Sequence, residues 1–154
     1  MKLILAVSQD GFLARGPDDS MTWTGPLDKF AFKLLTLSDG LPLYAGSATF
    51  DSLPPLKGRK VYRLSQDGSP ESMSLEQAWT NNENAWLIGG PAIAEKALHA
   101  GYVDRVFLCV VPEDLGSGIE VAPLRRFMPQ EPIMSVKYDG YEVQVYEGSI
   151  ADGP

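Results

Sequence analysis

The chain has 154 residues, of which 44% are hydrophobic and 21% are charged, which is typical of one soluble globular domain and excludes a largely disordered chain. Its formal net charge of −7 repels phosphate backbones and anionic lipid surfaces, so we expect neither a nucleic-acid nor a membrane partner. The single cysteine, Cys109, excludes an internal disulfide. The single histidine, His99, is interpreted as a surface residue near a helix end, which argues against zinc sites and histidine-based triads.

The N-terminal stretch predicts a buried strand followed by a polar loop. Residues 2–7 form a continuous apolar run, and Asp10-Gly11 then turns the chain. The run is too short for a signal peptide or a membrane span, so we expect a cytoplasmic protein. Residues 14–25 are rich in Gly, Pro, Asp and Ser, which predicts a mobile loop outside the core.

The first helix is expected over residues 26–38. Pro26 begins it well, because proline is favoured in the first turn of a helix. Phe30, Leu34 and Leu37 then recur at helical spacing, so we expect them to mark the apolar face of an amphipathic helix.

The rest of the chain alternates strands with helices. In chain order, we expect a strand at 41–45, a helix at 47–53, a strand at 60–65, a helix at 75–79, a strand at 85–88, a helix at 91–99 and a strand at 103–111. The last part predicts two strands, 133–138 and 141–146, joined by the hairpin dipeptide Asp139-Gly140.

This alternation predicts an α/β fold with a single three-layered domain over residues 1–148 and a short tail over residues 149–154. A twisted, mostly parallel sheet would carry helices on both faces and end in an antiparallel C-terminal hairpin. Ligands in such sheets bind at the carboxyl ends of the strands. We therefore expect a site near the turn after Ala6, the Gly46-Ser47 junction and the Gly89-Gly90 junction.

Asp28 is the first candidate for chemistry. An aspartate in the first turn of a helix is often only a surface group that stabilises the helix dipole. Here Phe32 follows one helical turn later, and the preceding loop carries Met21 and Trp23, large apolar side chains that usually cover something. A carboxyl group in such surroundings is partly desolvated, which raises its pKa and suits an acid that works near neutral pH.

Two further segments are candidates for binding anions. Gly89-Gly90 ends a strand before the helix at Pro91, where the backbone can approach a ligand closely and the helix N-terminus favours phosphate. Residues 57–60, Lys-Gly-Arg-Lys, are a basic spot on an acidic chain that suits a carboxylate or phosphate, although a solvated strand end explains it equally well.

In chain order, these segments resemble dihydrofolate reductases over residues 2–146. The most specific match joins Met21-Thr22-Trp23 to residues 26–33, Pro-Leu-Asp-Lys-Phe-Ala-Phe-Lys, which look like the family's tryptophan-bearing loop and catalytic helix. Residues 45–53 are similar to the family's cofactor segment, and residues 56–60 to the segment whose arginine grips the folate carboxylate. Ile88-Gly89-Gly90 resembles the family's glycine pair, which is usually joined by a cis peptide bond.

The resemblance implies NADPH-dependent reduction of 7,8-dihydrofolate to tetrahydrofolate in one-carbon metabolism, by a cytoplasmic monomer that binds small molecules, antifolates among them, and no metal. Asp28 would hold the pterin ring and favour protonation of its N5, while Trp23 and Met21 would close the loop over it. The implied substrate-binding residues are Leu5, Ala6, Phe32, Leu53, Leu56, Arg59, Ile88 and Cys109. The implied cofactor-binding residues are Ala6, Leu13, Gly46, Ser47, Ala48, Thr49, Leu64, Ser65, Gln66, Ile88, Gly89, Gly90, Pro91, Ala92 and Ile93.

The phosphate pocket departs from the family pattern. Ser47 stands where the family usually has the arginine that holds the adenosine 2′-phosphate, and Ala48 replaces a commonly basic or polar neighbour. Loss of that guanidinium removes a charge-assisted contact worth roughly 1.5–3 kcal/mol, and Arg63 is the candidate replacement. Cys109, a weak donor, aligns with the threonine that supports the acid in the family.

Two other interpretations stay open. Residues 111–119 are similar to a run in the pyrimidine reductase of riboflavin synthesis, which shares this fold. The thinned cofactor pocket also suits a catalytically weak relative that serves binding or assembly. Trp23, Asp28 and Arg59 favour the folate interpretation.

Overall fold

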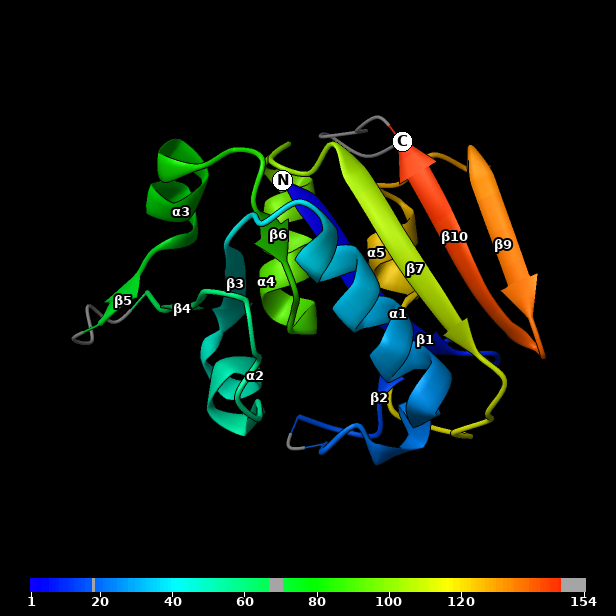
Figure 1. The fold of residues 1–154 in the computed structure, drawn as a ribbon. Helices are drawn as coiled ribbons and strands as arrows, with labels where there is room; N and C mark the ends of the chain where they lie inside the picture. The colour runs from blue at the N-terminus through cyan, green and yellow to red at the C-terminus, as the bar shows by residue number, and fades with distance from the viewer. Residues whose placement is uncertain (18, 67–70, 148–154) are drawn as a thin grey trace.

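Two sheets organise the chain in a computed structural model that describes residues 1–17, 19–66 and 71–147 (Figure 1). The strands of the main sheet are β1 (Lys2–Ser8), β3 (Leu43–Gly46), β4 (Val61–Leu64), β5 (Ser72–Met73), β6 (Trp86–Leu87), β7 (Arg105–Val111), β9 (Met134–Tyr138) and β10 (Tyr141–Glu147). They lie in the order β5-β4-β3-β6-β1-β7-β10-β9. A second, two-stranded sheet pairs β2 (Phe12–Ala14) with β8 (Ile119–Glu120).

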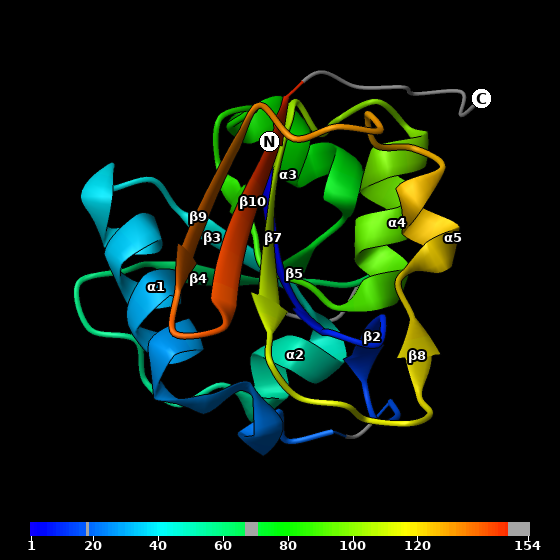
Figure 2. The same ribbon diagram turned by 90° about the vertical axis from the view of Figure 1, so that its right-hand side faces the viewer.

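Helices lie on both faces of the main sheet, so the fold has three layers (Figure 2). The helices are η1 (Thr22–Thr24), α1 (Gly25–Ser38), α2 (Ser47–Ser52), α3 (Leu75–Asn81), α4 (Pro91–His99) and α5 (Ala122–Arg125). Helix α1 covers one face, and α4 and α5 cover the other (Figure 2). The pairs from β5 to β7 are parallel, whereas β7–β10 and β10–β9 are antiparallel. The predicted α/β class, mostly parallel sheet and C-terminal hairpin are confirmed.

Alternation along β1 builds a separate core on each face of the sheet. Leu3, Leu5 and Val7 belong to the core under α4 and α5, whereas Ile4 belongs to the core under α1. Because both faces are covered, the strand has the continuous apolar sequence of a buried parallel strand. Burial of each large aliphatic side chain contributes about 1.5–3 kcal/mol, which ties both helical layers to β1.

Helix α1 has the predicted span but not the predicted buried face. The side chains of Phe30, Leu34 and Leu37 are 65%, 60% and 37% exposed, so the prediction that they mark the core-facing side is wrong. Leu27 and Ala31 pack against the core instead. The exposed set and the buried pair both recur at helical spacing, so periodicity alone does not tell which face of the helix is buried.

Three of the short elements, β5, β8 and α5, were not predicted from the sequence. β5 and β8 have two residues each, and α5 has four, which is too few for a periodic pattern. The β2–β8 sheet is supported by Asp10, whose carboxylate accepts hydrogen bonds from the backbone N–H groups of Leu115 at 3.1 Å and Gly116 at 2.8 Å. This contact ties the loop after β7 to the turn after β1.

The C-terminal hairpin turns at the predicted dipeptide. Asp139 and Gly140 have φ angles of 51° and 83°, so both adopt the left-handed conformation that a tight two-residue hairpin turn requires. Tyr141 consequently pairs with Tyr138 across the turn, which sets the register of β10.

Two remaining expectations concern the ends and surface of the chain. His99 is exposed at the end of α4, as predicted. The predicted domain end at residue 148 and the predicted tail, residues 149–154, lie outside the described residues. Within the part of the chain that the structure describes, no helix combines the length and the apolar character needed to cross a membrane.

Gly118 allows the close approach of the loop before β8 to β2. A Cβ atom at Gly118 would lie 2.1 Å from the carbonyl oxygen of Ala14, and the φ angle of Gly118 is 143°. We expect Gly118→Ala to lower the free energy of unfolding by about 2 kcal/mol or more, measured by denaturant unfolding. Gly116→Ala is the matched control, because Gly116 also has a positive φ, 77°, but nothing lies within 4 Å of the added Cβ. Equal losses in the two variants would exclude the Ala14 contact as the cause.

Candidate active site

A large cavity lies at the carboxyl ends of β1, β3 and β6, and side chains from α1 and α2 form part of its wall. Its volume is about 1480 Å³, more than the roughly 300–1,000 Å³ of a typical site for one small molecule. The cavity therefore has room for two ligands side by side. Its position is the one at which open parallel sheets bind ligands.

The residues that the resemblance implies come together around this cavity. Every residue of the implied substrate-binding and cofactor-binding groups lines it, as do Asp28 and Met21. Trp23 lies beside the cavity and is not part of its wall. Its side chain is only 8% exposed, because the indole packs in the core under α1.

Asp28 occupies the first turn of α1, and its carboxyl group is half-buried in the cavity wall. Burial raises the pKa of Asp28 above its ordinary value, because the charged form loses hydration. The Tyr141 hydroxyl donates a hydrogen bond to Asp28 Oδ1 at 2.9 Å, and this bond and the nearby Lys29 oppose the rise by stabilising the carboxylate. The result is an acid that keeps its proton to higher pH than an exposed aspartate does.

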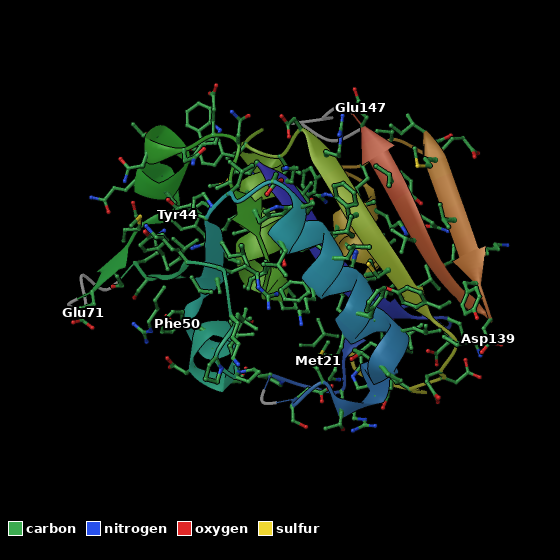
Figure 3. The ribbon with its side chains drawn as sticks, viewed as in Figure 1. Met21, Tyr44, Phe50, Glu71, Asp139 and Glu147 are labelled. Carbon is green, nitrogen blue, oxygen red and sulfur yellow. The ribbon has the colours of Figure 1, made fainter. Side chains whose placement is uncertain are left out.

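The loop that precedes α1 is held by Asp19. The Asp19 carboxylate accepts hydrogen bonds from the backbone N–H groups of Arg15 at 2.6 Å and Met21 at 2.9 Å. It also accepts a hydrogen bond from Trp23 Nε1 at 2.9 Å. Met21 itself adopts a left-handed conformation, with a φ angle of 60°. Figure 3 shows Met21 near the lower end of α1 and Phe50 on α2.

Close backbone packing forms another part of the wall. The Gly46 N–H donates to the Gly89 carbonyl at 2.7 Å, and a Cβ atom on Gly46 would lie 3.4 Å from Gly90 N. A Cβ atom on Gly90 would lie 3.2 Å from Thr49 Oγ1. The Gly89–Gly90 peptide bond is cis, as the resemblance implies, and α4 begins directly after it at Pro91. Side chains larger than hydrogen at Gly46 or Gly90 would fill this space. Because glycine stands there, the backbone and the N-terminus of α4 stay open to a ligand, and we call this part of the wall the glycine cradle.

Arg59 supplies a cation at the other end of the cavity. Its Nη1 donates to Thr36 Oγ1 at 3.1 Å, its Nε donates to the Lys57 carbonyl at 3.2 Å, and its guanidinium lies 5.8 Å from the centre of the Phe32 ring. In residues 1–17, 19–66 and 71–147, no carboxylate forms an ion pair with Arg59. The guanidinium is therefore held in place with its charge available to an anionic ligand.

Among the described residues, the arginine expected to serve the region around Ser47 is not free. The Ser47 hydroxyl donates to the Leu64 carbonyl at 3.0 Å. Arg63, the candidate replacement for the missing arginine, is paired with Asp51 at 3.3 Å between Nε and Oδ1. The glycine cradle and the N-terminus of α4 fit the pyrophosphate of a nicotinamide dinucleotide. An additional phosphate near Ser47 would meet the Ser47 hydroxyl and the guanidinium of Arg63, which already has a carboxylate partner.

Sequence reasoning missed three residues that organise the site: Asp19, Thr36 and Tyr141. Asp19 lies in a polar loop where many acidic residues serve only solubility. Thr36 is fully buried on α1, and Tyr141 belongs to β10, which is 113 residues from Asp28 along the chain. No local pattern marks such contacts, because they depend on how distant strands and loops are placed.

Comparison with protein-family models and with curated protein sequences found no match to this chain. Among solved structures, the chain is similar to Schistosoma mansoni dihydrofolate reductase, with a TM-score of 0.61 and 21% sequence identity. The similarity covers 96% of this chain and 97% of that chain, so it spans the whole domain and not one motif. The chain therefore has the dihydrofolate reductase fold.

Proposed function

We propose that the chain is an NADPH-dependent dihydrofolate reductase, a cytoplasmic monomer that reduces 7,8-dihydrofolate to tetrahydrofolate in one-carbon metabolism. The observation that carries the proposal is the half-buried Asp28 carboxyl group in the wall of a cavity that also contains the Gly89-Gly90 cradle. A carboxyl group with a raised pKa suits an acid that works on a flat, nitrogen-rich ring.

Reduction adds a hydride to one carbon of the pterin and a proton to the adjacent N5. NADPH, when bound, supplies the hydride. Asp28 would accept hydrogen bonds from the amino group and ring nitrogen of the pterin, and its raised pKa favours protonation of N5. Phe32, Leu53 and Leu56 would pack against the rings, and Met21 would help the loop exclude water.

The two ends of the cavity supply different recognition chemistry. Gly46, Thr49 and the Gly89-Gly90 backbone would hold the cofactor, with the N-terminus of α4 beside its phosphates. Arg59 would form a bidentate pair with a carboxylate of the folate tail, for which the hydrogen bond to Thr36 already orients it.

The proposal is tested by following NADPH oxidation with dihydrofolate for the parent and for Asp28→Asn. We expect the parent to be active and kcat of Asp28→Asn to fall by about 10²-fold or more. The exposed carboxylate of Asp114, which lies outside the cavity wall, gives the matched control Asp114→Asn, with unchanged activity. An equally active Asp28→Asn would remove Asp28 from its role. Turnover of a riboflavin-pathway pyrimidine in place of dihydrofolate, or ligand binding without turnover, would favour one of the alternative interpretations.

Stability measurements separate loss of chemistry from loss of fold in Asp28→Asn. Because the pKa of Asp28 is raised in the folded state, the folded protein holds this proton more tightly than the unfolded chain does. The carboxyl group therefore lowers stability as pH rises above the ordinary carboxyl range, and asparagine removes that cost. We expect Asp28→Asn to unfold at pH 7 at the same Tm as the parent or a higher one; a large fall in Tm would attribute the lost activity to misfolding.

Arg59→Ala tests recognition of the substrate tail. Loss of a charge-assisted hydrogen bond costs roughly 1.5–3 kcal/mol, so we expect KM for dihydrofolate to rise by about tenfold or more, with little change in kcat. Thr36→Val should raise KM by a smaller factor, because Arg59 keeps its charge but loses one of its supports. Lys57→Ala is the control for a neighbouring exposed cation. A fall in kcat with unchanged KM would contradict the assignment.

Ser47→Arg tests the phosphate pocket. A guanidinium at this position would supply the cation that the region around Ser47 lacks, so we expect the ratio of kcat/KM for NADPH over NADH to rise by about tenfold. The comparison of the two cofactors is internal, because both share every contact except the phosphate. An unchanged ratio would show that the third phosphate does not bind near Ser47.

A further inference from the structure

We propose that Tyr141 is a positioning residue that holds the Asp28 carboxyl group in one orientation and sets the pH range of the reduction. The inference deepens the proposed function, on which its kinetic part rests. Tyr141 does not belong to any of the segments that carry the resemblance to dihydrofolate reductases, and its contact with Asp28 is visible only in the fold.

The placement of Tyr141 follows from the register of β10. Val143 pairs with Cys109 of β7, and side chains two residues apart point to the same face of a strand. Tyr141 therefore shares the α1-facing side of the sheet with Cys109, and both belong to the core beneath α1. From there the Tyr141 hydroxyl reaches across to the first turn of α1, 2.9 Å from Asp28 Oδ1.

The hydrogen bond has a defined direction. Burial raises the pKa of the Tyr141 hydroxyl far above its ordinary value, so this hydroxyl stays protonated and donates a hydrogen bond to the carboxylate. The titratable and charged groups that face Asp28 are Tyr141 from β10, Cys109 from β7 and Lys29 from α1. Burial raises the pKa of the Cys109 thiol to about 12, so this thiol is neutral as well. Asp28 is then the acidic member of this group whose charge the Tyr141 hydrogen bond stabilises.

The contact fixes the rotation of the Asp28 carboxyl group. Tyr141 occupies Oδ1, and among the described residues it is the one side chain that donates a hydrogen bond to the Asp28 carboxyl group. Oδ2 and the second lone pair of Oδ1 remain available to a ligand in the cavity, and rotation of the carboxyl group would break the Tyr141 bond. The same bond stabilises the ionised form against the effect of burial, so it limits how far the pKa of Asp28 rises.

Tyr141→Phe isolates the hydroxyl. The ring of Tyr141 is only 6% exposed, and phenylalanine preserves its packing while it removes the donor. Tyr146→Phe is the matched control, because Tyr146 is also buried on β10 but belongs to the core on the other face. The Tyr146 hydroxyl bonds to Gln144 and Arg125, away from the site. Tyr141→Leu, which also lacks the hydroxyl, repeats the measurement if the phenylalanine variant folds poorly.

Two readouts are measured for each variant. The first is the titration of the Asp28 carboxyl carbon by NMR in the ligand-free protein, assigned with Asp28→Asn. The second is the pH profile of kcat/KM with NADPH and dihydrofolate. We expect Tyr141→Phe to move both the NMR midpoint and the alkaline limb of the profile upward by roughly one pH unit, from the loss of one hydrogen bond to a charged group. Tyr146→Phe should move neither.

The two readouts separate failure of this inference from failure of the proposed function. An Asp28 titration that is the same in the parent and in Tyr141→Phe would overturn the inference, whatever the activity. A shifted titration in a protein that does not reduce dihydrofolate would uphold the contact and reject the reductase assignment. A kcat/KM profile that keeps its limb although the NMR midpoint moves would overturn the claim that Tyr141 sets the pH range.

Discussion

The site depends on keeping the Asp28 carboxyl group partly out of water at the open end of a parallel sheet. A carboxylate resists burial, so the cavity wall raises the pKa of Asp28, and the Tyr141 hydroxyl limits the rise by donating a hydrogen bond to the ionised form. The protein thus contains two opposed effects on one group. Burial is the larger of the two, so the pKa of Asp28 is raised.

Three polar contacts hold the walls around that group, and each comes from a residue that the chemistry itself does not use. Asp10 ties the loop after β7 to the turn after β1, and Asp19 ties Trp23 and Met21 into the loop before α1. Thr36 holds the Arg59 guanidinium against the helix that carries Asp28. Because these contacts join distant segments, the cavity keeps its shape only when the whole domain is folded.

Much of the fold follows from local sequence, and the exceptions have physical causes. Pro91 marked the start of α4 and Asp139-Gly140 marked the hairpin, because each residue type has a restricted or special backbone conformation. Periodicity set the span of α1 but not its face, since Phe30 and Leu34 follow the same helical spacing as the residues that are buried. β5 and β8 have only two residues each and no period to detect, whereas β6, equally short, lies in the apolar run 85–88 that predicted it.

Local sequence likewise indicated some residues of the candidate site and not others. Asp28 became a candidate because the signs are local: an acid in the first turn of a helix, with Phe32 one turn away and a tryptophan-bearing loop before it. Its partner Tyr141 was missed because the β7–β10 register alone brings it near. Arg63 was expected to compensate for Ser47, and only the fold shows that Asp51 already pairs with it.

The most direct measurement of the central claim is a crystal structure of the protein with folate bound. The account predicts that the pterin ring lies in the cavity with its amino group and ring nitrogen within about 2.6–3.2 Å of the Asp28 carboxyl oxygens, and Tyr141 still bonded to Oδ1. A pterin bound elsewhere, or an Asp28 side chain turned into bulk solvent, would contradict it.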